Sequence, residues 1–373
     1  MTIDYRKEIE EYRAEMTEAE RMEKYMKGEE VDHLPFGLLS SDECFSNILG
    51  YTTTEMREDF DIMCKVIDFR IKEYGLHGIS VGLNLRTLGY VAGSKPYYPE
   101  NGVDHVDEFR FPRGVDLDVD SLKKPDPYND EVMTPMLDLA RKLKERFPDE
   151  TISTGVCAPI SSATGIRPVE ALLKDTRKNR EEYDKLLDYC LKASLKWAEA
   201  FNKEFGPVQT SIADPVACTD ILSPKQFDDL ALPYLRDLAD GLYEINGIKP
   251  SLHICGHTKM IWDRLRELNI SSLSVDNWED IGECREAFGE KMPIVGNVPP
   301  TDILAIGTPE EVVESVKTCI KKAGASPNGY ILNTGCAVVF STPRENIDAF
   351  VYAVRKYGVN AVKGKVPEAV YQD

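Results

Sequence analysis

Residues 249–256 read Lys-Pro-Ser-Leu-His-Ile-Cys-Gly, a short apolar run that ends in a histidine, a cysteine and a glycine. Short runs of this kind, bounded by Pro or Gly, are typical of buried strands. An imidazole and a thiolate are also preferred ligands of zinc. The stretch therefore predicts a strand, Lys249–Ile254, with reactive side chains at its carboxyl end.

Similar apolar runs recur along the chain, and helical patterns separate them. The expected strands are Leu34–Leu39, His77–Val81, Thr151–Val156, Val208–Ala213, Lys249–Ile254, Ser271–Val275, Met292–Gly296 and Tyr330–Asn333. The expected helices are 54–74, 130–146, 179–205, 224–245, 258–268, 278–288, 309–323 and 343–357. Strands that are each followed by a helix favour an α/β fold, a (β/α)₈ TIM barrel, here with an N-terminal helix before it.

An open doubly wound sheet is the alternative fold, but the chain has neither Gly-x-Gly-x-x-Gly nor Gly-x-x-x-x-Gly-Lys-Ser/Thr. The stretch 85–127 contains Pro, Gly and aromatic residues with little helical periodicity. It is interpreted as a capping insertion after the second strand. No repeat or linker divides the sequence, so residues 1–373 are expected to form a single domain.

The composition excludes several classes of partner. The chain has 45 basic and 64 acidic side chains and a net charge of −19, which repels nucleic acid and anionic lipid. No stretch approaches the ~20 apolar residues of a membrane span, and the N-terminus lacks the pattern of a signal peptide. Nine cysteines, an odd number, fit no disulfide framework. A cytoplasmic protein is expected.

A second cysteine, Cys336, follows another predicted strand in Asn333-Thr334-Gly335-Cys336. Structural zinc sites usually take four ligands as two close pairs, whereas about 80 residues separate Cys255 from Cys336. His253, Cys255 and Cys336 are therefore predicted to bind Zn²⁺ as a three-ligand site with an open position. The alternative is that these cysteines are small buried hydrophobic residues. His257 is expected to face solvent or to support the site from outside.

Three polar residues follow other predicted strands: Asp214, Asp276 and Asn297. Chemistry in a TIM barrel gathers at the carboxyl ends of the strands, so these residues are candidates for catalytic roles. The two aspartates could orient His253 or complete the zinc shell. The alternative for Asp214 and Asn297 is a turn before a nearby proline.

The chain resembles the uroporphyrinogen decarboxylase superfamily, and within it the zinc-dependent corrinoid:thiol methyltransferases. The resemblance is strongest after about residue 150 and runs through the segments 212–217, 221–224, 232–235, 252–256, 274–276, 295–298, 335–336 and 342–347. It implies that His253, Cys255 and Cys336 are the zinc ligands. The arginine-bearing N-terminal motif of the decarboxylases has no match near Leu34-Pro-Phe-Gly37, which tells against porphyrinogen chemistry.

The chain lacks the Asp-x-His-x-x-Gly motif of corrinoid-binding domains, so the corrinoid is expected on a separate protein. The expected reaction moves a methyl group between methylcobalamin on that protein and a zinc-activated thiol such as coenzyme M. One alternative is methylation of the corrinoid protein from a methoxy or methylamine donor. The others are a non-catalytic zinc-stabilised binding protein and a uroporphyrinogen decarboxylase.

Overall fold

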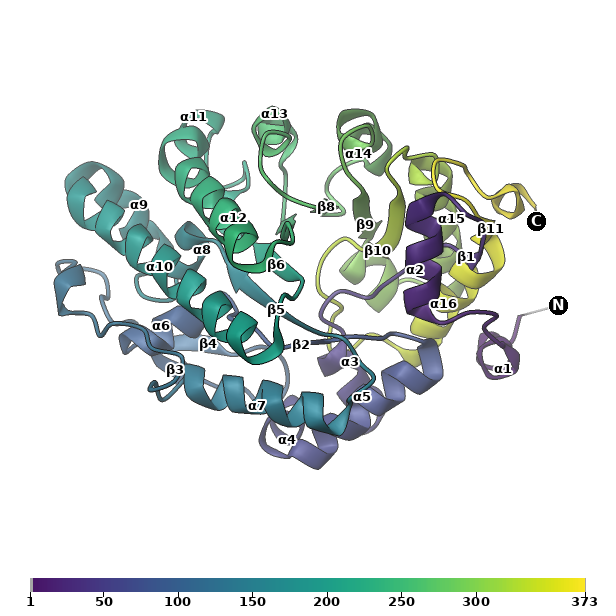
Figure 1. Ribbon diagram of the computed structural model, residues 1–373, viewed down its shortest axis with the longest axis horizontal. Helices are drawn as coiled ribbons and strands as arrows, with labels where there is room; N and C mark the ends of the chain where they lie inside the picture. The colour runs from purple at the N-terminus through teal and green to yellow at the C-terminus, as the bar shows by residue number, and fades with distance from the viewer. Residues whose placement is uncertain (1–2, 373) are drawn as a thin grey trace. The chain divides into compact units, whose positions relative to one another are not determined.

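The structure, a computed structural model, describes residues 3–372. It divides into two compact units, whose elements are labelled in Figure 1. The first unit contains the chain up to His77, the segment Glu100–Gly102 and the chain from Ser272. The second unit contains Gly78–Pro99 and Val103–Ser271. The single domain predicted for residues 1–373 stays a prediction.

The second unit contains four parallel strands in the order β7-β6-β5-β2. In this register Val156 of β5 lies opposite Ile212 of β6, and Ala213 of β6 lies opposite His253 of β7. The elements of this unit are β2 (Ile79–Ser80), α6 (Thr87–Ala92), β3 (Lys95–Tyr97), β4 (His105–Glu108), α7 (Met133–Arg146), β5 (Ile152–Cys157), α8 (Pro159–Ala163), α9 (Val169–Lys178), α10 (Arg180–Phe205), β6 (Thr210–Ala213), α11 (Pro224–Gln226), α12 (Leu232–Asn246), β7 (Ser251–Ile254) and α13 (Trp262–Leu265).

The first unit contains the parallel strands β8, β9 and β10 and a separate antiparallel pair, β1 with β11. Leu273 of β8 and Tyr330 of β10 both lie opposite Ile294 of β9. The elements of this unit are α1 (Tyr5–Glu11), α2 (Glu18–Lys27), β1 (Val31–His33), α3 (Asp42–Ile48), α4 (Thr53–Glu58), α5 (Phe60–Tyr74), β8 (Ser272–Val275), α14 (Ile281–Phe288), β9 (Ile294–Val298), α15 (Pro309–Ala323), β10 (Tyr330–Thr334), α16 (Arg344–Tyr357) and β11 (Val359–Ala361).

Helix α15 shows how the sequence sets these elements. Thr308 accepts a hydrogen bond from the backbone N–H of Glu311, and the Glu311 carboxylate accepts one from the N–H of Thr308. Pro309 occupies the first helical position, where its missing N–H costs nothing. The buried residues recur at helical spacing, namely Val312, Val313, Val316, Cys319, Ile320 and Ala323. This face packs against α16 and β9, so the helix is held at its start and along one side.

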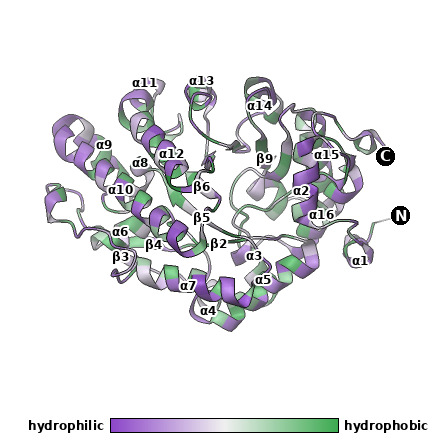
Figure 2. Ribbon diagram, in the orientation of Figure 1, coloured by the Kyte–Doolittle hydropathy of each residue, from purple (hydrophilic) through white to green (hydrophobic). Residues whose placement is uncertain are grey.

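In the core of the second unit, two successive hydrogen bonds link helix α10 to strand β5 and to the residue after β2. Trp197 of α10 is fully buried and donates from Nε1 to the Thr154 hydroxyl on β5 at 2.8 Å. That hydroxyl donates to the carbonyl of Val81, just beyond β2, at 2.7 Å. Each buried donor therefore has an acceptor. In Figure 2 the strands β5 and β6 are largely hydrophobic, whereas α9, α10 and α12 carry both colours, as amphipathic helices do.

The predicted strands and helices are largely confirmed, but the first strand, Leu34–Leu39, is wrong. Phe36 makes a single parallel bridge to Leu332. The bridge is supported by hydrogen bonds from Gly37 N to Leu332 O and from Leu332 N to Pro35 O. Pro35 has no N–H for a ladder, and Ser40 has a positive φ of 48°, so the segment cannot continue as a strand.

Two other segments differ from their predictions in detail. The expected helix 54–74 is interrupted at Asp59, whose side chain accepts from the N–H groups of Asp61 and Ile62 and so begins α5. The insertion 85–127 contains α6 and an antiparallel hairpin, β3 with β4. Its role as a cap stays a prediction. Within residues 3–372, no helix combines the length and apolar character that crossing a membrane requires.

Candidate metal centre

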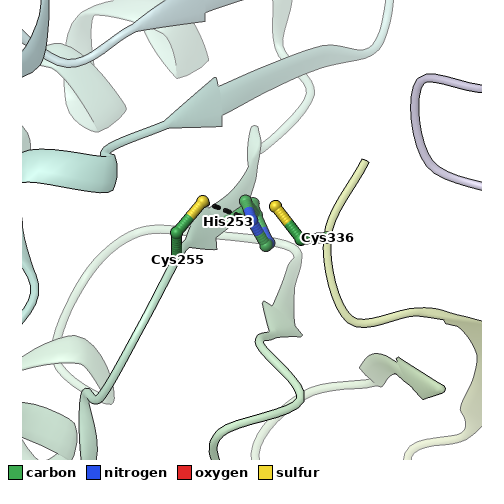
Figure 3. Close-up of side chains that lie close together, drawn as sticks. All are labelled: His253, Cys255 and Cys336. Carbon is green, nitrogen blue, oxygen red and sulfur yellow. Dashed lines mark hydrogen bonds between the residues drawn. The ribbon is translucent and has the colours of Figure 1, made fainter. Parts of the chain in front are cut away.

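His253 and Cys255 lie at the carboxyl end of β7, in the second unit. Leu252 and Ile254 are buried, whereas His253, between them on the opposite face of the strand, is only partly covered. His253 Nε2 and Cys255 Sγ are 3.2 Å apart, and Figure 3 shows the two side chains directed toward each other. Gly256 follows with a φ of +73°, a conformation that suits glycine and turns the chain immediately after the pair.

The loop that carries Cys255 is fixed by the loop after β6. The Asp220 carboxylate accepts from the backbone N–H of His257 at 2.9 Å and contacts His257 Nδ1 at 2.9 Å. The backbone N–H and hydroxyl of Thr219 both donate to the carbonyl of His257, at 2.8 and 2.9 Å. A Cβ on Gly256 would lie 2.6 Å from the same carboxylate, so only glycine fits there. Asp220 and Thr219 therefore hold the turn that positions Cys255.

These contacts explain the position of His257. Its imidazole is paired with Asp220, and its side chain is 51% exposed. This agrees with the expectation that His257 faces solvent, whereas support of the site from outside stays a prediction. The hydrogen bond with His257 lowers the pKa of the Asp220 carboxyl, so the pair favours the ionised carboxylate.

Asp214 follows β6 and is fully buried. Its backbone N–H donates to the carbonyl of His253 at 2.9 Å, which fixes the two strand ends side by side. One carboxylate oxygen accepts from the Ser161 hydroxyl at 2.6 Å, and the other has no hydrogen-bond partner among the described residues. Burial raises the pKa of Asp214 to about 7, although the Ser161 hydrogen bond opposes this. The predicted catalytic role of Asp214 stays a prediction.

Cys336, the third side chain drawn in Figure 3, belongs to the first unit and follows β10. The N–H of Gly335 donates to the carbonyl of Val298 at 2.9 Å, which continues the parallel ladder from β10 to β9. A Cβ on Gly335 would lie 2.5 Å from the backbone nitrogen of Asn277. Glycine at 335 thus lets the loop after β8 pack directly beside the residue that precedes Cys336.

Asp276 and Asn297 are both buried in this unit. The Asp276 carboxylate accepts from the backbone N–H of Trp278 at 3.2 Å. Asn297 lies within β9, not after it as expected, and its amide donates to the carbonyls of Asp276 and Glu279 at 3.0 and 2.8 Å. Both side chains thus hold the loop after β8. Their predicted catalytic roles are not tested by these contacts and stay predictions.

The nine cysteines fall into two classes by burial. Cys44, Cys64, Cys157, Cys190, Cys218, Cys284 and Cys319 are buried, whereas Cys255 and Cys336 are the two that solvent partly reaches. The buried-hydrophobe interpretation therefore fits seven cysteines and fails for the two predicted ligands. An imidazole nitrogen and thiol sulfurs at partly accessible strand ends are a donor set that fits zinc.

Sequence reasoning missed two residues, Ser161 and Asp220. Ser161 lies on α8 and reaches Asp214 from 53 residues away, and it also accepts from the N–H of Val216 at 3.0 Å. Asp220 reaches His257 across 37 residues. The only available signal was their position in the segments that follow β5 and β6.

Comparison with known proteins finds one matching family model and relatives that are named as methyltransferases. Residues 17–357 match the family model described as uroporphyrinogen decarboxylase (URO-D). The methylcobamide:CoM methyltransferase MtaA of Methanosarcina barkeri is 24% identical over 92% of this chain and 99% of its own length. MtbA of Methanosarcina acetivorans, with the same activity in its name, is 29% identical over 60% of this chain and 63% of its own length.

A solved structure of a methyltransferase from Methanosarcina mazei covers 92% of this chain and 99% of its own chain, with a TM-score of 0.77 and 23% identity. This likeness shows the fold, and the predicted α/β class of TIM-barrel type is confirmed.

Proposed function

The chain belongs to the uroporphyrinogen decarboxylase family, and we propose that it is a zinc-dependent methyltransferase that moves a methyl group between a corrinoid and a thiol such as coenzyme M. The observation that carries the proposal is the His253–Cys255 pair at the carboxyl end of β7. The relatives named as methylcobamide:CoM methyltransferases support it, since MtaA matches nearly the whole chain.

His253, Cys255 and Cys336 are the proposed zinc ligands. An imidazole and two thiolates are side chains whose chemistry suits a zinc ion. Bound there, zinc would keep a substrate thiol deprotonated at neutral pH and so nucleophilic. Three protein ligands leave one position for that thiol, which is the pattern of catalytic rather than structural sites.

The surrounding residues would hold the ligands in place. Asp220 and Thr219 fix the turn that carries Cys255, and the N–H of Asp214 holds the carbonyl of His253. Asp214 is kept in position by Ser161. Residues that orient ligands from outside the coordination sphere commonly contribute ~10–100-fold to affinity or activity. We assign this positioning role to Asp214 and to Asp276, whose carboxylate holds the loop beside Gly335.

The corrinoid is the second substrate, and we propose that a separate protein presents it. In the reaction, the thiolate sulfur forms a bond to the methyl carbon while the cobalt–carbon bond breaks. The electron pair of that bond stays on cobalt, which passes from Co(III) to Co(I), and the product is a thioether. Decarboxylation of uroporphyrinogen needs no sulfur ligands, so it leaves the His–Cys pair unexplained.

The proposal can be tested with free methylcobalamin and a panel of thiols, including coenzyme M and homocysteine. The expected result is thiol-dependent formation of cob(I)alamin, followed by its absorbance, with one thiol clearly preferred. Uroporphyrinogen should remain unchanged. If no thiol accepts the methyl group and a methoxy or methylamine donor methylates cob(I)alamin, the protein transfers methyl groups to the corrinoid, and the proposed transfer to a thiol is wrong. Decarboxylation of uroporphyrinogen by the zinc-free protein would overturn the proposal.

A further inference from the structure

Exposed hydrophobic side chains are unevenly distributed over this chain. The most exposed large ones among residues 3–372 are Met260 (65%), Trp278 (64%), Ile306 (76%) and Tyr371 (66%). The first three lie in the segments that follow β7, β8 and β9, respectively, and only Tyr371 lies elsewhere, near the C-terminus. Loops after parallel strands carry the binding residues of TIM-barrel proteins. These three exposed apolar side chains thus lie in the class of loop where TIM-barrel proteins bind their ligands.

Trp278 stands out because its loop is firmly held. The backbone N–H of Trp278 donates to the Asp276 carboxylate, and Asn297 donates to the carbonyls on both sides, those of Asp276 and Glu279. Asp280 then begins α14 by accepting from two backbone N–H groups and pairs with Lys322. The indole is therefore exposed on a turn whose backbone these hydrogen bonds hold before any ligand arrives.

The same turn lies next to the predicted ligand Cys336. A Cβ on Gly335 would meet the backbone nitrogen of Asn277 at 2.5 Å, so the residue before Trp278 packs on the residue before Cys336. All of these residues belong to the first unit. Trp278 therefore lies one residue beyond the point where the loop after β8 packs against the segment that carries Cys336.

We propose that Trp278 is a contact surface for the corrin ring of the methylated substrate. This inference rests on the proposed function, and it names the residue that recognises the larger substrate. A corrin is a broad, flat, conjugated macrocycle with an apolar face, and an indole is the largest planar apolar side chain that can stack on one. A small thiol offers no such face, so the contact distinguishes one substrate from the other.

The test measures binding of cyanocobalamin by equilibrium dialysis, because this corrinoid has no methyl group to transfer and its cobalt is already capped by cyanide. Trp278→Ala is expected to weaken binding about tenfold, the size expected from the loss of one aromatic stacking contact. Trp278→Phe, which keeps a ring, should recover part of the loss. Tyr371→Ala is the matched control, since Tyr371 is equally exposed and lies outside the strand-end loops.

Kinetics provide the second readout. With Trp278→Ala, the KM for methylcobalamin should rise about tenfold, while the KM for the thiol and the zinc content stay at the wild-type values. Normal cyanocobalamin binding by Trp278→Ala, or no binding by the wild type, would overturn this inference even if methyl transfer proceeds. Trp278-dependent binding without turnover for any thiol would support the inference while the proposed function fails.

Discussion

In the second unit, strand β5 ends in Cys157 and strand β7 is followed directly by Cys255, yet the two thiols lie in opposite environments. Cys157 is the last residue of β5 and is buried, and burial together with the nearby Asp214 carboxylate raises its pKa to about 12. Cys255 directly follows β7, is partly exposed and lies 3.2 Å from the His253 imidazole. Position after a strand is thus not sufficient for a metal ligand. The thiol must also be accessible and have a second donor beside it.

The largest expected effect comes from replacing Cys255 by alanine, with the same replacement of Cys157 as the control. Cys255→Ala should lose zinc and all measurable methyl transfer, because one of three ligands is gone. Cys157→Ala should keep both and lose only about 1–2 kcal/mol of unfolding free energy, as for a typical buried substitution. Elemental analysis and a denaturant titration check the pair. Full zinc content in Cys255→Ala would remove this cysteine from the proposed site.

Thiol labelling sharpens the same contrast without mutation. In zinc-free native protein, Cys255 and Cys336 should react with iodoacetamide at least about 100-fold faster than the seven buried cysteines, which must wait for local opening. Peptide mass spectrometry after timed quenching gives the rate at each site. Added zinc should protect the two fast thiols. Equal protection of a buried cysteine such as Cys157 would contradict the assignment.

A smaller effect is expected from the clamp, which is the set of hydrogen bonds of Asp220 and Thr219 with His257 that holds the loop after β7. Asp220→Ala removes the carboxylate that holds His257, so the turn carrying Cys255 should loosen and zinc affinity should fall about tenfold. A chelator competition titration measures the dissociation constant. Asp228→Ala is the matched control, because Asp228 is a partly exposed carboxylate of the same unit that pairs with Arg264 instead. Equal affinities in both variants would show that the clamp does not support the metal.

The smallest effect should follow removal of the metal itself. The proposed ligands lie at strand ends, whereas the folded state rests on buried residues such as Trp197 and Tyr330. Treatment with a zinc chelator should therefore leave the far-ultraviolet circular dichroism of the protein unchanged at 25 °C. A loss of helical signal would instead point to a structural zinc, whose binding free energy is part of the folding free energy.

Much of the fold could be predicted because the limits of helices and strands depend on residues close together in the sequence. The limits of α15, 309–323, follow from Thr308-Pro309 and an apolar face at helical spacing. The prediction of a strand at 34–39 was wrong because its apolar residues resemble a strand, whereas Pro35 and the positive φ of Ser40 end the ladder. Hydrophobicity indicates burial, but hydrogen-bonding capacity decides whether a strand continues.

The candidate site was only partly predictable for a different reason. His253 and Cys255 lie two residues apart and next to a strand, so their chemistry is visible in the sequence. Ser161 and Asp220 act through contacts with residues 53 and 37 positions away, which no local pattern encodes. Asn297 was predicted to follow its strand, yet it lies inside β9, and its amide donates hydrogen bonds to backbone carbonyls of the loop after β8.

The Asn297 amide links the register of β9 to the loop that presents Trp278. Side chains alternate faces along a strand, so a slip of one residue would turn Asn297 to the other side of the sheet and leave the carbonyls of Asp276 and Glu279 without their donor. Such a chain would lose the fixed turn. Cobalamin retention by a refolded sample would then report the fraction of molecules whose sheet has assembled in the native alignment.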